Sequence, residues 1–234
     1  MSRKEARKNN MRVTWLGQGG FLFEKNDFRV IVDPYLSNSV EKINSKNWRR
    51  FPVDEKWFSV RSDVMIFTHC HLDHYDPETV EHFITADSSV TVLAPGSVWG
   101  QVRTTGGDNN YVLFDRHTQW SEGGLVFRAV KAEHSDDHAI GVIIEDGEKK
   151  YYITGDTLYN TEIFQDLDKD IDVVFLPVNG VGNNMNAVDA ALFVQKIGAK
   201  VNVPMHYGLF DELKAEEMEL PGKRIMKPFE SEEF

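Results

Sequence analysis

The chain lacks several features that would place it in common protein classes. Only one of its 234 residues is cysteine, so no intramolecular disulfide can form and a disulfide scaffold is excluded. No apolar stretch approaches the length that spans a membrane, and residues 1–10 are charged and polar, unlike a signal peptide. We therefore expect a cytoplasmic protein that does not associate with membranes.

Positive charge is also scarce relative to negative charge. The chain has 26 Lys and Arg against 37 Asp and Glu, which gives a formal net charge of -11. Nucleic-acid phosphates are held mainly by clustered Lys and Arg, so this balance argues against DNA binding and weakens an RNA-binding role. A small anionic substrate remains compatible with the charge, because bound divalent cations would supply local positive charge.

Linkers, low-complexity tracts and internal repeats are missing as well. Apolar residues make up 41% of the chain and include 15 Phe and 5 Trp, which is ample material for a core. An α/β chain of this length can form one domain. We expect a flexible leader over residues 1–10 and a single domain over residues 11–234.

Short apolar runs separated by turn residues predict many strands. The expected strands cover residues 11–16, 21–24, 28–32, 63–67, 90–94, 111–114, 125–132, 139–145, 150–154, 173–178 and 201–204, and the expected helices lie near 77–85 and over 187–197. The long polar stretch over residues 36–60 is typical of a lid or binding loop. This order predicts an α/β fold in which two sheets pack face to face with helices outside, a four-layer αββα sandwich.

The segment richest in reactive side chains follows one of these strands. Residues 68–74 have the sequence THCHLDH, with three imidazoles and one carboxylate in six positions. In extended chain alternate side chains share a face, so His69 and His71 point together while Cys70 points away and is expected to be a small buried filler. Two converging imidazoles form half of a tetrahedral metal site.

The last two residues of the motif face a different point. Asp73 and His74 lie where the chain must turn, because Asp76 and Pro77 resemble a helix N-cap and a first helical position. Their side chains would therefore converge next to the first pair, which suggests a second metal.

Isolated histidines such as His82 and His117 are most simply surface or core residues without a ligand. That interpretation does not suit the motif, because three imidazoles beside a carboxylate would crowd desolvated polar groups at one strand end without a cation. The motif therefore favours a metal centre.

Three later residues share one context, an ionisable side chain just after a strand: His134, Asp156 and His206. Ligands at strand ends are well positioned because the sheet fixes their backbones. Gly155 next to Asp156 permits a close approach of the chain.

The order of these histidines and aspartates along the chain resembles the metal-binding pattern of the metallo-β-lactamase superfamily: His69, His71, Asp73, His74, His134, Asp156 and His206. The resemblance covers about Met11 to Phe210. Four segments are in addition similar to the L-ascorbate-6-phosphate lactonase-like hydrolases: Val13–Phe21, Asp33–Leu36, His134–Gly141 and Pro204–Gly208. The resemblance implies an αββα fold and a hydrolase with two metal ions.

The resemblance also implies which residues bind each metal. The first ion would be held by His69, His71 and His134, the second by Asp73, His74 and His206, and both by Asp156. A bridging role suits a carboxylate, since it has two oxygens. Imidazole-rich sites suit Zn, carboxylates also accept Mn or Fe, and the resemblance brings Mn into consideration.

A pair of cations lowers the pKa of a bridging water and polarises a scissile group, which suits hydrolysis of an ester, lactone, amide or phosphodiester. We expect a metal-bridging hydroxide to attack the substrate, and Asp73 to orient that nucleophile or move a proton while it also binds metal. His138 either donates to the substrate or only begins the next strand. The resemblance favours a phosphorylated, sugar-like lactone as substrate.

Four further residues have a functional and a structural interpretation. Arg49 and Arg50 would meet a substrate phosphate, since guanidinium matches phosphate geometry, or would be solvated loop charges. Asn179 would bind substrate or belong to an ordinary Asn-Gly turn. Asp33 would orient a metal ligand or only end a strand before Pro34.

Other functions stay open. The same centre can serve a phosphodiesterase acting on a cyclic nucleotide, RNA or a phospholipid, and a non-catalytic metal-binding protein is a second alternative. An oxygen-reducing di-iron enzyme is less favoured, because we see no flavin-binding half in this sequence. Whether the protein forms a homo-oligomer is not indicated by the sequence.

Overall fold

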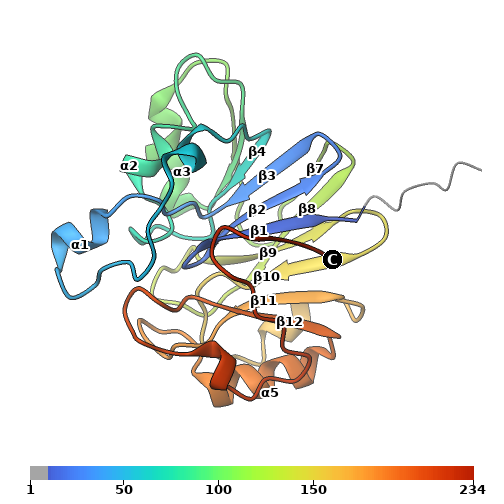
Figure 1. Ribbon diagram of the computed structural model, residues 1–234. Helices are drawn as coiled ribbons and strands as arrows, with labels where there is room; N and C mark the ends of the chain where they lie inside the picture. Colours follow the sequence, from blue (N-terminus) through green and yellow to red (C-terminus); the bar gives the residue numbers. More distant parts are fainter. Residues whose placement is uncertain (1–9) are drawn as a thin grey trace, which may run out of the picture.

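The structure is a computed structural model that describes residues 10–234, and these residues form two β-sheets that pack face to face (Figure 1). Within them the first sheet has the strand order β13-β1-β2-β3-β4-β5-β6 and the second β12-β11-β10-β9-β8-β7. The first sheet contains Arg12–Gly17 (β1), Gly20–Lys25 (β2), Phe28–Val32 (β3), Val64–Ile66 (β4), Thr91–Ala94 (β5), Asn110–Leu113 (β6) and Ser231–Glu233 (β13). The second contains Gln119–Glu122 (β7), Leu125–Lys131 (β8), Ile140–Glu145 (β9), Lys150–Ile153 (β10), Val173–Pro177 (β11) and Val201–Met205 (β12).

Aromatic side chains fill the space between the sheets. Phe21 and Phe23 of β2 meet Phe175 of β11, with ring centroids 4.7 and 5.6 Å apart. All three rings are fully buried. Alternate residues of each strand point to one face, which is why the spacing of two between these phenylalanines in β2 places both rings in this core.

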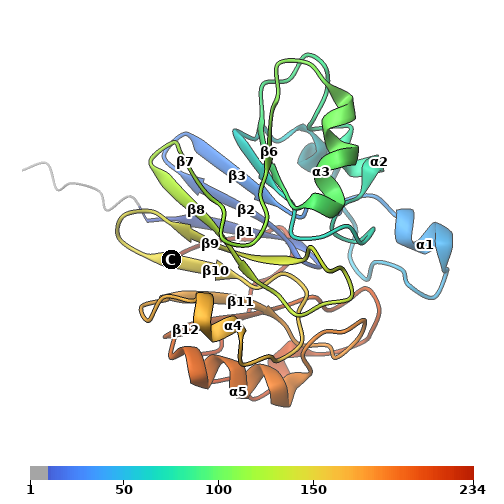
Figure 2. The ribbon, with the colours of Figure 1, turned by 180° about the vertical axis from the view of Figure 1, so that it is seen from behind.

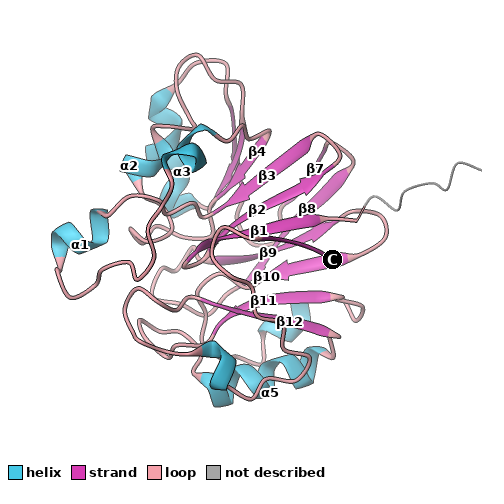
Figure 3. Ribbon diagram, viewed as in Figure 1, coloured by secondary structure: helices cyan, strands magenta, loops and turns pink. Residues whose placement is uncertain are grey.

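Helices cover the outer face of each sheet (Figure 3). Pro77–Val80 (α2) and Gly96–Val102 (α3) pack on the first sheet, and Ala187–Ile197 (α5) packs on the second. Figure 2 shows the short helix Ile163–Asp166 (α4) on the same side as α5, and Ser39–Ile43 (α1) projecting at the right of the view. The predicted αββα sandwich is therefore confirmed.

The parallel strands determine where side chains can meet. β10, β11 and β12 run parallel, so their carboxyl ends lie at one edge of the second sheet. β11 is buried along its whole length, in keeping with its continuous apolar sequence. Residues just after these strands, such as Asp156 three residues beyond β10 and His206 directly after β12, are consequently brought together.

Several elements differ from the sequence predictions. The helix expected near residues 77–85 is regular only over Pro77–Val80, and the polar stretch 36–60 contains α1 and a 3-10 helix at Glu55–Ser59. The strands β7 and β13 and the helix α3 were not predicted. The predicted leader lies outside the described residues except for Asn10, and the single domain stays a prediction.

In the described part of the chain, no helix combines the length and the apolar character needed to cross a membrane.

Candidate metal centre

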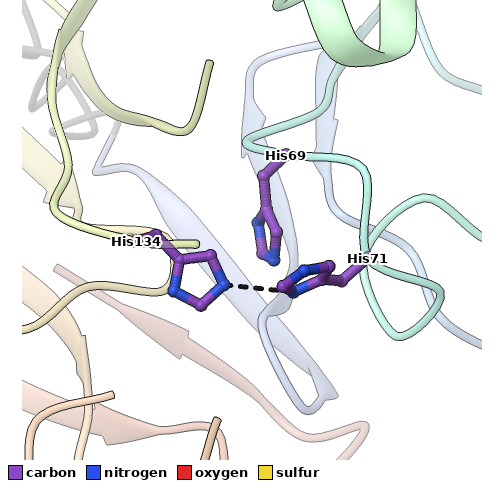
Figure 4. Close-up of side chains that lie close together, drawn as sticks. All are labelled: His69, His71 and His134. Atoms are coloured by element: carbon purple, nitrogen blue, oxygen red, sulfur yellow. Dashed lines mark hydrogen bonds between the residues drawn. The ribbon is translucent and has the colours of Figure 1, made fainter. Parts of the chain in front are cut away.

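Three imidazoles from two loops converge at the edge between the sheets. The side chains of His69, His71 and His134 point toward one another in Figure 4, and one ring nitrogen of each lies within 4.8 Å of the others. His134 Nε2 is 3.0 Å from His71 Nδ1. His69 is fully buried, whereas the other two are partly exposed. This first cluster joins His134, three residues beyond β8, with the motif after β4.

A second cluster of two aspartates and two histidines lies beside it. His206 Nε2 is 3.0 Å from Asp156 Oδ2 and 3.2 Å from Asp73 Oδ2. His74 Nε2 is 3.1 Å from Asp156 Oδ1. All four side chains are buried. Such a convergence of nitrogen and carboxylate donors is costly in an interior unless a cation or protons balance the charge.

The two clusters adjoin one another through Asp156. Its Oδ1 atom faces His74 of the second cluster, while His69 Nε2 of the first cluster is 3.9 Å from its Oδ2 atom. The rings of His69 and His74 have centroids 4.1 Å apart. This geometry supports the predicted bridging role of Asp156, which remains a prediction.

Backbone geometry explains how Asp156 comes so close to the motif. Gly155 has a positive φ of 61°, and a Cβ atom at this position would lie 2.8 Å from the carbonyl oxygen of Ile140 and 3.0 Å from the Cβ of Thr68. Only glycine fits there without displacing the neighbouring strand and the residue before His69.

The donors fit divalent cations. His69 Nε2, His74 Nε2 and Asp156 Oδ1 are buried atoms that make no well-aligned hydrogen bond, although His74 Nε2 and Asp156 Oδ1 face each other at 3.1 Å. They point into the two clusters, and imidazole nitrogen with carboxylate oxygen is a donor set that first-row divalent metals accept. The orphaned atoms are therefore accounted for if each cluster holds a cation.

A cavity of about 350 Å³ opens onto the second cluster. It is lined by Asn47, His71, Asp73, Ser135, Asp156, Val181, Gly182, Asn183, His206 and Phe210. The ring of Phe210 stacks on that of His206 with centroids 5.9 Å apart, and Val181 is 40% exposed. Part of the wall is thus apolar, and the lining contains no Lys or Arg.

The chain matches a family model described as a beta-lactamase superfamily domain over residues 12–206. It belongs to this superfamily. A UPF0173 protein of Pyrococcus furiosus is 28% identical and covers 96% of this chain and 100% of its own. A UPF0173 metal-dependent hydrolase of Staphylococcus epidermidis is 27% identical, with 96% of this chain and 100% of the relative covered. The structure of a metallo hydrolase, Igni18 of Ignicoccus hospitalis, is similar with a TM-score of 0.73, 22% identity and coverage of 96% and 98%.

The predicted resemblance is confirmed at the level of the metallo-β-lactamase superfamily, whereas the lactonase-like group stays a prediction. Superfamily membership and the orphaned donors together point to a metal-dependent hydrolase.

Asp33 is placed where it can orient two parts of the centre. Its Oδ2 atom is 2.8 Å from His74 Nδ1, and its Oδ1 atom accepts a hydrogen bond of 2.8 Å from the backbone N–H of Thr68. The side chain is fully buried. A carboxylate on Nδ1 favours the tautomer that leaves Nε2 free for a metal.

Two amide side chains that the sequence analysis did not single out also contact the centre. Asn184 donates to Asp156 Oδ2 at 2.8 Å and accepts from the N–H of Thr157. Gln18 Nε2 lies 2.8 Å from Asp73 Oδ2 and 3.0 Å from His206 Nε2. Both come from loops whose composition is that of ordinary turns, so no local signal in the sequence marks them.

The buried charges shift one another's pKa values. Burial disfavours protonation of His206, but Asp156 and Asp73 outweigh it and raise the pKa of His206 to about 9. Burial is likewise outweighed at His74, where the same two carboxylates raise the pKa well above its ordinary value. Burial lowers the pKa of His69 and keeps it neutral, the form that binds metals. The raised pKa values favour protonated His74 and His206, whose charges balance the carboxylates.

The structure does not bring Arg49 into the cavity at the metal centre. Its side chain is buried, and Nη2 donates to the carbonyl oxygens of Tyr35 at 2.8 Å and Ser37 at 2.9 Å. The guanidinium carbon lies 4.4 Å from the centroid of the Tyr35 ring. These contacts give Arg49 a role in holding the chain after β3.

Arg50 also binds backbone rather than lining this cavity. Its backbone N–H donates to the carbonyl oxygen of Gly208 at 3.1 Å, and its side chain donates to the carbonyl oxygen of Leu209. It therefore ties the loop after α1 to the segment that follows His206.

Asn179 connects two loops at the rim of the cavity. Its Nδ2 atom donates to Asp211 Oδ2 at 3.1 Å, and its Oδ1 atom accepts from the N–H of Val181 at 3.2 Å. The side chain thus holds the segment containing Val181, which lines the cavity, and does not itself line it.

His138 lies at a different cavity, which it lines with Asp115, Arg116 and Lys131. Its Nδ1 atom is 3.4 Å from Asp115 Oδ1, and its ring packs against Gly96 at the start of α3. The structure therefore gives no support to a catalytic role for His138. The expectation that Cys70 is buried is wrong, because the turn after β4 leaves this side chain exposed.

Proposed function

We propose that this protein is a dinuclear metal-dependent hydrolase that cleaves a small carbonyl substrate, an ester or a lactone. The observation that carries the proposal is the pair of adjoining donor clusters with Asp156 between them and orphaned donor atoms in each. When bound, two cations activate a water molecule and polarise the scissile group.

The residues of the chain would divide the work as follows. His69, His71 and His134 would hold one cation, Asp73, His74 and His206 would hold the other, and Asp156 would be shared by both. Asp73 lines the cavity, and its neighbours His74 and His206 keep its pKa low against the effect of burial. It is therefore an ionised carboxylate at neutral pH, placed to orient the attacking water.

The cavity lining supports a substrate without a phosphate group. Phosphate sites in proteins use Arg, Lys or clustered backbone N–H groups. Arg49 and Arg50 bind backbone carbonyls elsewhere, and the lining offers Phe210 and Val181 as apolar contacts. We therefore favour a neutral carbonyl substrate over the phosphorylated sugar-like lactone suggested by the sequence.

The test is hydrolysis by full-length protein loaded separately with Mn, Zn or Fe, on a panel of lactones, carboxylic esters, amides and phosphodiesters. We expect turnover of esters or lactones that depends on the metal. Preferential cleavage of phosphodiesters would establish the phosphodiesterase alternative, and metal binding without any turnover would establish the non-catalytic one.

Asp156→Ala is the matched variant for this test, and Asp137→Ala, an exposed aspartate near His138, is its control. We expect Asp156→Ala to lose metal and turnover together, because it removes the carboxylate shared by the clusters. Full activity with unchanged metal content in Asp156→Ala would contradict the bridging role.

A further inference from the structure

We propose that the side-chain amide of Gln18 is an additional oxygen ligand of the cation held by Asp73 and His206. This inference rests on the proposed metal binding. It concerns a residue in the turn between β1 and β2, far in sequence from the metal-binding motif.

The position of the amide is that of a ligand. Gln18 is 1% exposed, and its Nε2 atom is 2.8 Å from Asp73 Oδ2 and 3.0 Å from His206 Nε2. Ligand atoms at neighbouring vertices of an octahedral cation with bonds of about 2.1 Å lie about 3 Å apart. The amide atom therefore has the spacing from both donors that a shared cation requires.

The orientation of the amide depends on what it faces. In the structure Nε2 donates to Asp73 Oδ2 and lies 3.0 Å from His206 Nε2, while Oε1 is buried without a hydrogen-bond partner. Oxygen and nitrogen of an amide have nearly the same shape, so a half-turn of the group exchanges them. A cation between the two donors repels the N–H group and attracts the oxygen. In either orientation one of the two atoms, Nε2 or Oε1, is left without a partner. A bound cation would therefore favour the orientation in which Oε1 faces the centre.

The backbone of Gln18 is fixed against the centre. Its φ of 51° lies in the left-handed region, which a long side chain seldom adopts. Its carbonyl oxygen accepts hydrogen bonds from Trp15 Nε1 and from the N–H of His206, both at 3.0 Å. Strained residues of this kind cluster at functional sites, where the surrounding structure holds them.

The next residue confirms how tightly this turn packs on the ligands. A Cβ atom at Gly19 would lie 2.5 Å from His74 Cε1. The turn therefore contacts His74 through the backbone of Gly19 and reaches Asp73 and His206 through Gln18.

A neutral amide oxygen has a consequence for metal preference. Carbonyl oxygens suit Mn and other hard cations better than Zn. Gln18 should therefore favour Mn at this position, whereas the cation at His69, His71 and His134 should be unaffected by it.

The experiment is a titration of metal-free, full-length protein with Mn²⁺ and, separately, with Zn²⁺, followed by calorimetry and by metal analysis after dialysis. The variants are Gln18→Leu, which removes both polar atoms, and Gln18→Glu, which keeps an oxygen but cannot donate an N–H group. Gln101→Leu, an exposed glutamine of α3, is the control. Circular dichroism of each metal-free variant establishes that it is folded. Gln18→Asn, which tolerates the left-handed backbone but has a shorter reach, provides a second loss-of-ligand variant.

We expect the wild type to bind two Mn²⁺ ions. Gln18→Leu and Gln18→Asn should weaken one of the two by at least about tenfold, and Gln18→Glu should bind both at least as tightly as the wild type. If Gln18 serves only as a hydrogen-bond donor to Asp73, Gln18→Glu places two carboxylates together and weakens binding as much as Gln18→Leu does. That result, or unchanged binding by Gln18→Leu, overturns the assignment. A wild type that binds no metal overturns the proposed function itself.

Discussion

The Nδ1 atom of His74 lies 2.8 Å from the Oδ2 atom of Asp33, and both side chains are fully buried. The same aspartate accepts the backbone N–H of Thr68, the residue before His69. One carboxylate therefore sets the ring orientation of a ligand in the second cluster and the backbone that carries a ligand of the first. It couples the geometry of the two proposed metal positions.

Asp33→Asn should weaken metal binding by about 10- to 100-fold, the range found when a partner of a metal ligand is changed. Asparagine tolerates the φ of 42° at this position, so the backbone should be kept while the acceptor for His74 and for the Thr68 hydroxyl is lost. Calorimetric metal titration measures the effect. Asp27→Asn, at an exposed turn, is the control, and equal affinities of Asp33→Asn and wild type would contradict the role of Asp33.

Metal binding should release protons and strengthen as the pH rises from about 6 to 9. In the metal-free centre burial opposes a charged His206, but Asp156 and Asp73 raise its pKa to about 9, above the ordinary value of 6.5. The protonated form therefore predominates at neutral pH, and a cation must displace this proton. Calorimetry in two buffers of different ionisation enthalpy measures the number released. Binding heats that do not depend on the buffer would contradict the prediction.

The raised pKa of His206 also determines how the stability of the metal-free protein changes with pH. Because the folded metal-free protein binds a proton at His206 more tightly than the unfolded chain does, this stabilisation is complete below pH 6.5 and is lost as the pH rises through about 9. The denaturation midpoint of metal-free protein should fall over this interval. Metal-loaded protein should not show this component, since His206 is then neutral throughout.

Elements with strong local signals were predictable from the sequence. The helix α5 has the expected bounds because Asn186 caps it, accepting from the N–H groups of Val188 and Asp189, and Gly198 ends it in a left-handed conformation. By contrast β13 is a short polar strand, Ser231–Glu233, that forms only by pairing with β1 at the opposite end of the chain. Such a pairing depends on the assembled sheet, and the sequence of β13 by itself shows no strand pattern.

In the candidate site, too, some residues were predictable from a local signal in the sequence and others were not. The ligands predicted from the sequence share a recognisable context, since each follows a strand or belongs to the dense motif. Asn184 lacks that context, and Gln18 follows β1 but stands in a Gly-rich turn, so the contacts of both depend on how loops pack. Arg49 shows the opposite error: its residue type suits a phosphate, but its loop directs it to backbone carbonyls.

Arg49→Ala should lower the free energy of unfolding by about 2 kcal/mol, because it removes charge-assisted hydrogen bonds to the carbonyl groups of Tyr35 and Ser37 and the contact with the Tyr35 ring. Urea denaturation of the metal-loaded protein measures the loss. Arg61→Ala is the matched control, since the Arg61 side chain is 75% exposed and its pair with Asp63 should contribute little. An unchanged stability combined with a raised KM for phosphorylated substrates alone would restore the substrate-binding interpretation of Arg49.

Phe210→Ala should reduce the preference for substrates with long apolar acyl groups. The ring lines the cavity and stacks on His206, so an acyl chain above the metal centre would be buried against it. Loss of about 1.5 kcal/mol of apolar contact corresponds to about a tenfold loss in kcat/KM for long-chain esters, with little change for acetate esters. Esters of increasing acyl length measure this on metal-loaded protein, and Leu192→Ala, on the exposed face of α5, is the control. An equal loss at every chain length would show instead that Phe210 acts by holding His206, and the metal affinity of Phe210→Ala would then fall as well.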